Sequence, residues 1–202
     1  GSVVTWGYSS YGGNSSSVAS SLTSGVTKIY SQKAVFAALK SDGSVVTWGS
    51  NSTGGDSSSV ASSLTSGVTQ IYSNQRAFAA LKTDGTVVTW GYRDFGDSSS
   101  VASSLTDVIS ITPAVTAFAA LKSDGTVVTW GKDISEIDYQ NYDQSVALNS
   151  GADSSLVASS LTDVISITAS FNYQWPQTKS AFAALKTDGS VVTWGHSDYG
   201  GN

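Results

Sequence analysis

Short apolar runs recur along the chain, separated by segments rich in serine, glycine and aspartate. In residues 77–90 the run AFAALK is followed by TDGT and then by VVTW. Two β-rich runs joined in this way predict a hairpin whose turn is centred on Asp84 and Gly85. Because the first run is apolar on both faces, we expect its strand to be covered on both sides. GVTQIY, at 67–72, predicts a third strand.

A short helical turn is predicted between each Trp-Gly pair and the next strand. In residues 56–67, Asp56 is placed to cap this turn, Val60 and Leu64 lie four positions apart, and Gly67 ends it. Serine is a poor helix former, so the turn is expected to be short. In the third and fourth copies LTSGV becomes LTDV, which removes the glycine.

These elements form a tandem repeat. VVTWG occurs five times, with its tryptophans at positions 6, 48, 90, 130 and 194. Strand-rich units of about 42 residues predict an all-β protein of β-propeller-type blades, with an open stacked β-repeat or solenoid as the alternative. We expect one repeat domain, 1–202. Its units are approximately 1–42, 43–84, 85–124 and 125–188, with a partial unit at 189–202.

The pattern AALKxDGxVVTWG followed by SGVxxI resembles the regulator of chromosome condensation repeat. It is most similar to the compact bacterial repeats of the β-lactamase inhibitory protein II type propeller. The resemblance covers nearly the whole chain apart from the insertions, and it implies a protein-binding platform. Such rings typically have about seven blades, within a general range of about four to eight. With four AFAALK-type strands, this chain fits a small ring, an incomplete fragment or an open stack.

The two ends of the chain are at nearly the same phase of the repeat. Residues 1–14 and 189–202 differ only at two positions, Tyr8/His196 and Ser10/Asp198. The N-terminal VVTWG also lacks a hairpin partner of its own. An unpaired strand edge invites pairing, either with the C-terminal blade of the same chain or with a neighbouring molecule.

Two stretches vary between copies. The first follows Trp-Gly and reads YSSY, SNST, YRDF and HSDY; the second lies between the third predicted strand and AFAALK. Strand direction puts both at one end of each blade, opposite the Asp-Gly turns, and variable loops on a rigid scaffold commonly form binding sites. Candidate residues on this secondary loop face are Tyr8, Tyr11, Arg93, Phe95, His196 and Tyr199.

The fourth copy enlarges both stretches, with insertions at 132–153 and 169–180. The inserts are rich in acidic and aromatic residues, and exposed tyrosine and tryptophan are favoured interface anchors. We therefore predict a partner-binding patch there. Its candidate residues are Tyr139, Tyr142, Phe171, Tyr173, Trp175, Asp138 and Asp143. The alternatives are that the two inserts pack on each other as a closed local cluster, or that they vary neutrally.

Composition narrows the function classes. Only 12% of residues are charged and the net charge is -5, which argues against a nucleic-acid partner because such a partner requires a basic face. The absence of cysteine excludes disulfides, thiolate metal sites and cysteine nucleophiles. No apolar run approaches the ~20 residues that span a bilayer. This polar, charge-poor composition suits a bacterial secreted or surface protein.

Catalytic and metal chemistry have little support in the sequence. The single histidine, His196, is interpreted as a surface residue rather than the base of a triad. The acidic stretch DISEIDYQNYD lacks a recognised calcium-loop spacing. We therefore expect no enzyme activity, no metal and no cofactor. Aromatic residues beside acidic ones make a carbohydrate-binding lectin an alternative.

The sequence thus predicts a non-enzymatic extracellular protein-interaction module that displays variable loops on a rigid β-repeat scaffold. The competing hypothesis is a self-assembling protein of a surface layer, matrix or filament, whose matched ends join copies. The expected partner is another protein or a second copy, with a glycan as a further option. Neither nucleic acid nor insertion into a membrane is expected.

Overall fold

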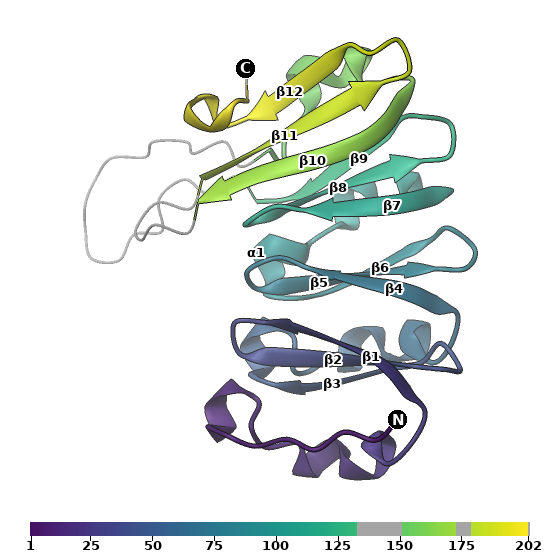
Figure 1. Ribbon diagram of the computed structural model, residues 1–202, viewed down its shortest axis with the longest axis vertical. Helices are drawn as coiled ribbons and strands as arrows, with labels where there is room; N and C mark the ends of the chain where they lie inside the picture. Colours follow the sequence, from purple (N-terminus) through teal and green to yellow (C-terminus); the bar gives the residue numbers. More distant parts are fainter. Residues whose placement is uncertain (133–150, 173–178, 202) are drawn as a thin grey trace. The chain divides into compact units, whose positions relative to one another are not determined.

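Four three-stranded antiparallel sheets make up the computed structural model, which describes residues 1–132, 151–172 and 179–201, with the side chains at 93, 94, 171 and 172 left aside (Figure 1). Each sheet is one blade, so the predicted all-β class and its three-stranded units are confirmed. The strands are β1 Val26–Gln32, β2 Val35–Lys40 and β3 Val45–Gly49; β4 Val68–Ser73, β5 Ala77–Lys82 and β6 Val87–Gly91; β7 Val108–Pro113, β8 Ala117–Lys122 and β9 Val127–Gly131; β10 Val164–Asn172, β11 Lys179–Lys186 and β12 Val191–Gly195.

The second blade shows how the repeat folds. Strands β5 and β6 pair from Leu81↔Val87 to Ala77↔Gly91, so the Asp-Gly turn closes a tight hairpin as predicted. The Asp84 carboxylate accepts the backbone N–H of Thr86 at 3.0 Å and its hydroxyl at 2.6 Å. Strand β4 pairs along the other edge of β5, with a bulge near its start.

The middle strand of each blade is covered on both faces. All five residues from Ala77 to Leu81 are buried, which confirms the expectation drawn from their apolar pattern. Across the hairpin the rings of Phe78 and Trp90 stack with centroids 5.2 Å apart. The same stack recurs in the other three blades at 5.1–5.3 Å, between Phe36 and Trp48, Phe118 and Trp130, and Phe182 and Trp194.

The predicted helical turns are 3₁₀ helices. Asp56 caps the start of one such segment, η4 (Ser58–Leu64), by accepting the backbone N–H of Ser58 at 2.9 Å. Leu64 is buried and Val60 packs against the core. The tighter 3₁₀ form agrees with a sequence that is too serine-rich to sustain an α-helix. The equivalent segments are η2 (Ser16–Leu22), η5 (Ser99–Ser104) and η6 (Ser155–Ser160).

The change from LTSGV to LTDV removes a glycine but keeps its backbone conformation. Asp107 and Asp163 have φ of 56° and 57°, close to the 77° of Gly67, which also directly precedes a strand. Aspartate is one of the few residues that tolerate this left-handed region. The carbonyl of Asp107 accepts the N–H of Ser123 at 2.9 Å, as that of Gly67 accepts the N–H of Thr83 at 2.8 Å. The aspartate therefore replaces the glycine in the blade geometry.

The chain divides into two compact units, Gly1–Asp97 and Ser98–Asn202, each with two complete blades. In the first unit Trp90 Nε1 donates to the carbonyl of Gly54 at 3.2 Å, and Trp48 Nε1 donates to that of Gly12 at 3.0 Å. In the second unit Trp194 Nε1 donates to the carbonyl of Gly151 at 3.0 Å. The tryptophan of a blade is thus bonded to the loop that precedes that blade.

The core of each unit is formed where side chains from two blades meet. In the first unit Val35 and Leu39 belong to the same buried cluster as Ile71 and Phe78. In the second unit Ala119 and Leu121 cluster with Phe182. Blades of this kind suit both the propeller and the open stack that the sequence predicts. Within the described ranges, no helix is long and apolar enough to cross a membrane.

Candidate functional site

The two variable loops of each blade lie at the same end of its sheet (Figure 1). In the second blade β4 ends at Ser73 and β6 ends at Gly91, and both positions lie beside the start of β5 at Ala77. The Asp84-Gly85 turn is at the opposite end of β5. We call these the loop end and the turn end of a blade. The deduction from strand direction is therefore correct for the individual blades.

A side-chain hydrogen bond joins the two loops of a blade. In three blades a side chain from the end of the first strand, or just after it, donates to the carbonyl of the fourth residue after the Trp-Gly pair. The bonds are Gln32 Nε2 to Thr53 O, Asn74 Nδ2 to Phe95 O at 2.8 Å, and Ser170 Oγ to Tyr199 O at 2.7 Å. Three different residue types do the same task, and for that reason the sequence comparison did not find it.

Asn74 is the most deeply placed of these donors. Its side chain is only 5% exposed, and its Oδ1 accepts the backbone N–H groups of Arg76 at 3.0 Å and Ala77 at 2.8 Å. With the bond to Phe95 O, one buried amide satisfies three backbone groups in two loops. Buried polar groups are costly when unpaired, so this residue fixes the shape of the loop end.

Edge-to-face aromatic pairs recur in the loops that follow Trp-Gly. Three of these four loops carry rings at positions i and i+3, which a single helical turn brings to the same side. The pairs are Tyr8–Tyr11 at 6.2 Å, Tyr92–Phe95 at 5.5 Å and His196–Tyr199 at 5.8 Å between centroids. The loop at 50–53, SNST, has no ring. Each blade therefore presents a different surface on the same frame.

The predicted residues of the secondary loop face differ in exposure. Tyr8 and Tyr11 are 76% and 59% exposed. Phe95 is only 2% exposed, in contrast to its expected place on the surface, because it lies in the short helix α1 (Arg93–Gly96), which packs on β5 and β6. The guanidinium of Arg76, from the other loop, lies 5.3 Å from the Tyr92 ring and 5.5 Å from the Phe95 ring. Phe95 thus supports two neighbours that are nearer to solvent.

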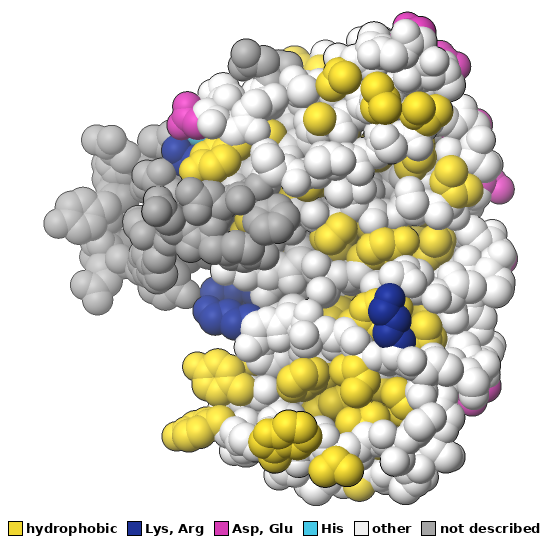
Figure 2. Space-filling view, viewed as in Figure 1, with side chains coloured by type: hydrophobic (Ala, Val, Ile, Leu, Met, Phe, Trp, Pro, Cys, Tyr) yellow, Lys and Arg dark blue, Asp and Glu magenta, His cyan; other side chains and the backbone are white. Residues whose placement is uncertain are grey.

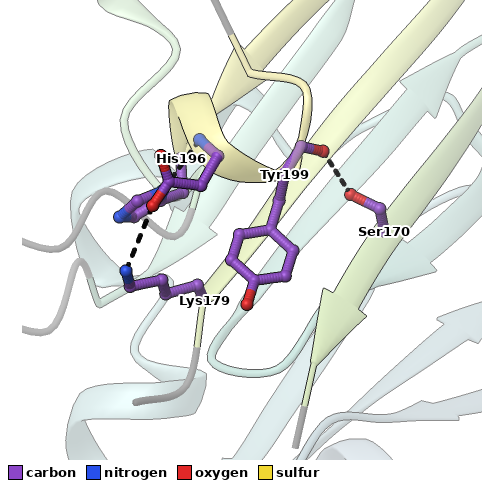
Figure 3. A network of polar contacts seen from close by, with 5 residues as sticks. Ser170, Lys179, His196 and Tyr199 are labelled. Atoms are coloured by element: carbon purple, nitrogen blue, oxygen red, sulfur yellow. Dashed lines mark hydrogen bonds and ion pairs between the residues drawn. The ribbon is translucent and has the colours of Figure 1, made fainter. Parts of the chain in front are cut away.

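The C-terminal loop carries a small polar network (Figure 3). His196 Nδ1 accepts the backbone N–H of Asp198 at 3.2 Å and so caps the 3₁₀ turn η7 (Ser197–Tyr199). Lys179 Nζ lies 3.3 Å from Asp198 Oδ2, in an ion pair exposed on the aspartate side. The hydroxyl of Ser170 donates to a carbonyl rather than to the histidine. This geometry gives His196 a structural task and does not form a nucleophile–base pair.

Most of the predicted partner-binding patch lies outside the described residues. This holds for Tyr139, Tyr142, Tyr173, Trp175, Asp138 and Asp143. For Phe171 the backbone is described, in β10 opposite Ser180, and the side chain is not. The patch stays a prediction. Within the described part of the chain, no three His, Cys, Asp or Glu residues come together as metal ligands.

Trp6 is a feature that sequence reasoning assigned only to the frame. Its side chain is 84% exposed, whereas the tryptophans of the four complete blades are 3–5% exposed. Hydrophobic side chains gather around this N-terminal segment in the lower part of Figure 2. The available signal was the lack of a hairpin partner for the first VVTWG.

These blades define an all-β repeat protein whose rigid hairpin frames carry variable loops. No protein-family model and no curated protein matches the sequence. Among solved structures, human WBSCR16 is similar at 18% identity and a TM-score of 0.48, covering 84% of this chain and 47% of its own. Yeast RCC1, Prp20, is similar at 16% identity and a TM-score of 0.47, covering 84% of this chain and 43% of its own.

The CRINKLY WD40 ectodomain of the Arabidopsis thaliana receptor kinase ACR4 is also similar, at 16% identity and a TM-score of 0.44, covering 85% of this chain and 51% of its own. With RCC1 among its structural neighbours, the predicted RCC1-like character of the repeat is confirmed. The compact bacterial subtype stays a prediction. The chain spans less than half the length of WBSCR16 and Prp20, and at these identities the likeness concerns the fold alone.

Proposed function

We propose that this chain is a non-enzymatic protein-interaction module that binds a partner protein through the loop ends of its blades. One observation carries this proposal: nearly identical hairpins hold loops of different chemistry at one end. A tyrosine pair, an arginine stacked on two rings and a His–Lys–Asp network occupy equivalent places. Rigid scaffolds with variable loops are the usual construction of recognition surfaces.

The internal bracing of the loops supports recognition by a preformed surface. Hydrogen bonds from Asn74 and Ser170 hold both loops of a blade before any partner arrives. A preformed surface loses less conformational entropy on binding than a flexible one. We further propose that the module acts outside the cell, on a bacterial surface or in secreted form. Yeast Prp20, one of the structural neighbours, is described bound to Kap60.

The test compares matched charges at the two ends of one blade. Tyr92→Asp places a carboxylate at the loop end, and Thr83→Asp places one on the exposed turn end. Immobilised chains are incubated with an extracellular protein fraction, and retained proteins are identified by mass spectrometry. We expect wild type and Thr83→Asp to retain the same protein and Tyr92→Asp to lose it, while all three keep their melting temperature. Equal loss in both variants, or retention no different from bare resin, would refute the proposal.

A further inference from the structure

Residues 3–7 have the backbone form of a third blade strand, although no strand pairs with them among the described residues. Gly7 has φ of +107°, within the same left-handed range as Gly49, Gly91 and Gly195 at +115°, +125° and +111°. At those three glycines a Cβ would approach the backbone of the middle strand, or the residue before it, to between 2.4 and 2.7 Å. At Gly7 it would meet nothing within 4 Å. The segment is shaped for a neighbour whose place is open.

The same segment is anchored as the other third strands are. The N–H of Val26 donates to the carbonyl of Gly1 at 2.9 Å, just as Val68 donates to Gly43 at 3.0 Å. In addition, the N–H of Val3 donates to the carbonyl of Leu22 at 3.0 Å. The strand is therefore fixed on its first blade, and its open side faces solvent in a defined orientation.

An apolar groove of about 350 Å³ lies beside this segment. We call it the Trp6 groove, and its lining includes Val4, Trp6, Tyr11, Ile29, Phe36 and Trp48. Val4 is 78% exposed, Trp6 84% and Ile29 46%. In every complete blade the equivalent tryptophan stacks on a phenylalanine of the middle strand. What the groove lacks is therefore a middle strand with its phenylalanine.

We propose that the Trp6 groove is a strand-docking site that receives β11 of a second copy of this chain, in the place that β12 holds in the structure. Residues 1–14 match 189–202 at all but two positions, so residues 3–7 offer β11 the same side chains that β12 does. In the β12 register, Trp194 lies opposite Phe182 and Thr193 opposite Ala183. Docked in this way, Trp6 stacks on Phe182 and Thr5 lies opposite Ala183.

The edge that β12 covers is the least buried of its kind. Val191, the first residue of β12, is 59% exposed, whereas its equivalents Val45, Val87 and Val127 are half-buried. Ala183 is half-buried, whereas Ala37, Ala79 and Ala119 are completely buried. The exchange keeps the strand pairs of β11 and removes Val4 and Trp6 from water, so apolar burial favours it. Because the two surfaces differ, the contact repeats head to tail and gives a chain or a closed ring of copies.

Two single-cysteine variants test the register directly, since the chain has no cysteine of its own. Thr5→Cys and Ala183→Cys are mixed, oxidised and analysed by intact mass. We expect a disulfide-linked pair with one of each variant, whose yield rises with protein concentration. Ala79→Cys replaces Ala183→Cys in the control and should give no pair, because both edges of β5 are held by β4 and β6. Adding Trp6→Ala to the Thr5→Cys chain should lower the yield on the order of tenfold, the effect of a buried interface anchor.

Light scattering over a concentration series gives the second measurement. Wild type should gain molar mass with concentration, and Trp6→Ala should stay monomeric with an unchanged melting temperature, because this exposed side chain supports little of the fold. A monomer at every concentration together with no cross-linked pair overturns the proposal. A disulfide within one chain of the Thr5→Cys, Ala183→Cys double variant at high dilution also overturns it, since the strand then docks on its own β11. Partner capture at the loop end, tested through Tyr92, is independent of all these outcomes.

Discussion

The buried amide of Asn74 offers a quantitative test of how the loop end is held together. Asn74→Ala removes one donor and one double acceptor and leaves Phe95 O and the N–H groups of Arg76 and Ala77 without these partners. An unsatisfied buried group costs roughly 1–3 kcal/mol, and water admitted by the shorter side chain recovers part of the loss. We expect the free energy of unfolding to fall by about 2–4 kcal/mol. For a chain of this length that corresponds to a drop of about 5–15 °C in melting temperature.

Urea unfolding followed by tryptophan fluorescence, with calorimetry in parallel, measures this loss. The matched control is Ser170→Ala, which removes the equivalent brace in another blade, where one exposed hydroxyl makes a single bond. Its cost should stay within about 1 kcal/mol. Gln32→Ala should fall between the two, because Gln32 makes one brace and its Oε1 accepts no hydrogen bond. If Asn74→Ala costs no more than Ser170→Ala, burial does not decide the strength of the brace and the reasoning is wrong.

Three further predictions follow from pairs of equivalent positions. Trp48→Ala should cost about 3–5 kcal/mol of unfolding free energy and Trp6→Ala no more than about 0.5 kcal/mol, because only Trp48 is buried; urea unfolding at low protein concentration compares them. Gly49→Ala should cost about 1–3 kcal/mol more than Gly7→Ala, because both have positive φ but only the Gly49 Cβ meets a backbone oxygen, at 2.4 Å; similar losses would contradict this. Hydrogen bonds from Thr86 lower the pKa of Asp84 from its ordinary 3.8, and Ser44, Thr126 and Ser190 do the same for Asp42, Asp124 and Asp188. A lowered folded pKa gives stability that is complete above the unfolded value and is lost as pH falls through the folded one. The melting temperature should therefore drop on acidification below about pH 4, less so in Asp84→Asn, and a flat profile would refute the assignment.

The blade itself was predictable because its signals are local. The Asp84-Gly85 pair sets the hairpin, and the apolar residues on both faces of 77–82 require cover on both sides. Strand direction then places both variable loops at one end, which the register of β4, β5 and β6 confirms. Each of these inferences needs only neighbouring residues and the two-residue period of a strand.

The details of the loop end were not predictable, because they depend on contacts between segments distant in sequence. Gln32, Asn74 and Ser170 share a role but not a residue type, so comparison of the copies shows them only as variation. The residue type of Phe95 suggests an exposed anchor, whereas the packing of α1 on β5 and β6 buries it. Trp6 has the same sequence neighbours as Trp48, and only the strand beside Trp48 makes their environments different.

The hydrogen bond from each blade tryptophan to a glycine carbonyl has a consequence for how such proteins diversify. Trp48 and Trp90 reach carbonyls 36 positions earlier, whereas Trp194 reaches one 43 positions earlier, across the second insertion of the fourth copy and its one-residue deletion. The bond lengths nevertheless agree within 0.2 Å. The attachment is therefore blind to the length of chain between its two ends. Selection can lengthen a loop in one copy without retuning the frame, so new surface accumulates in single copies while the hairpins stay interchangeable.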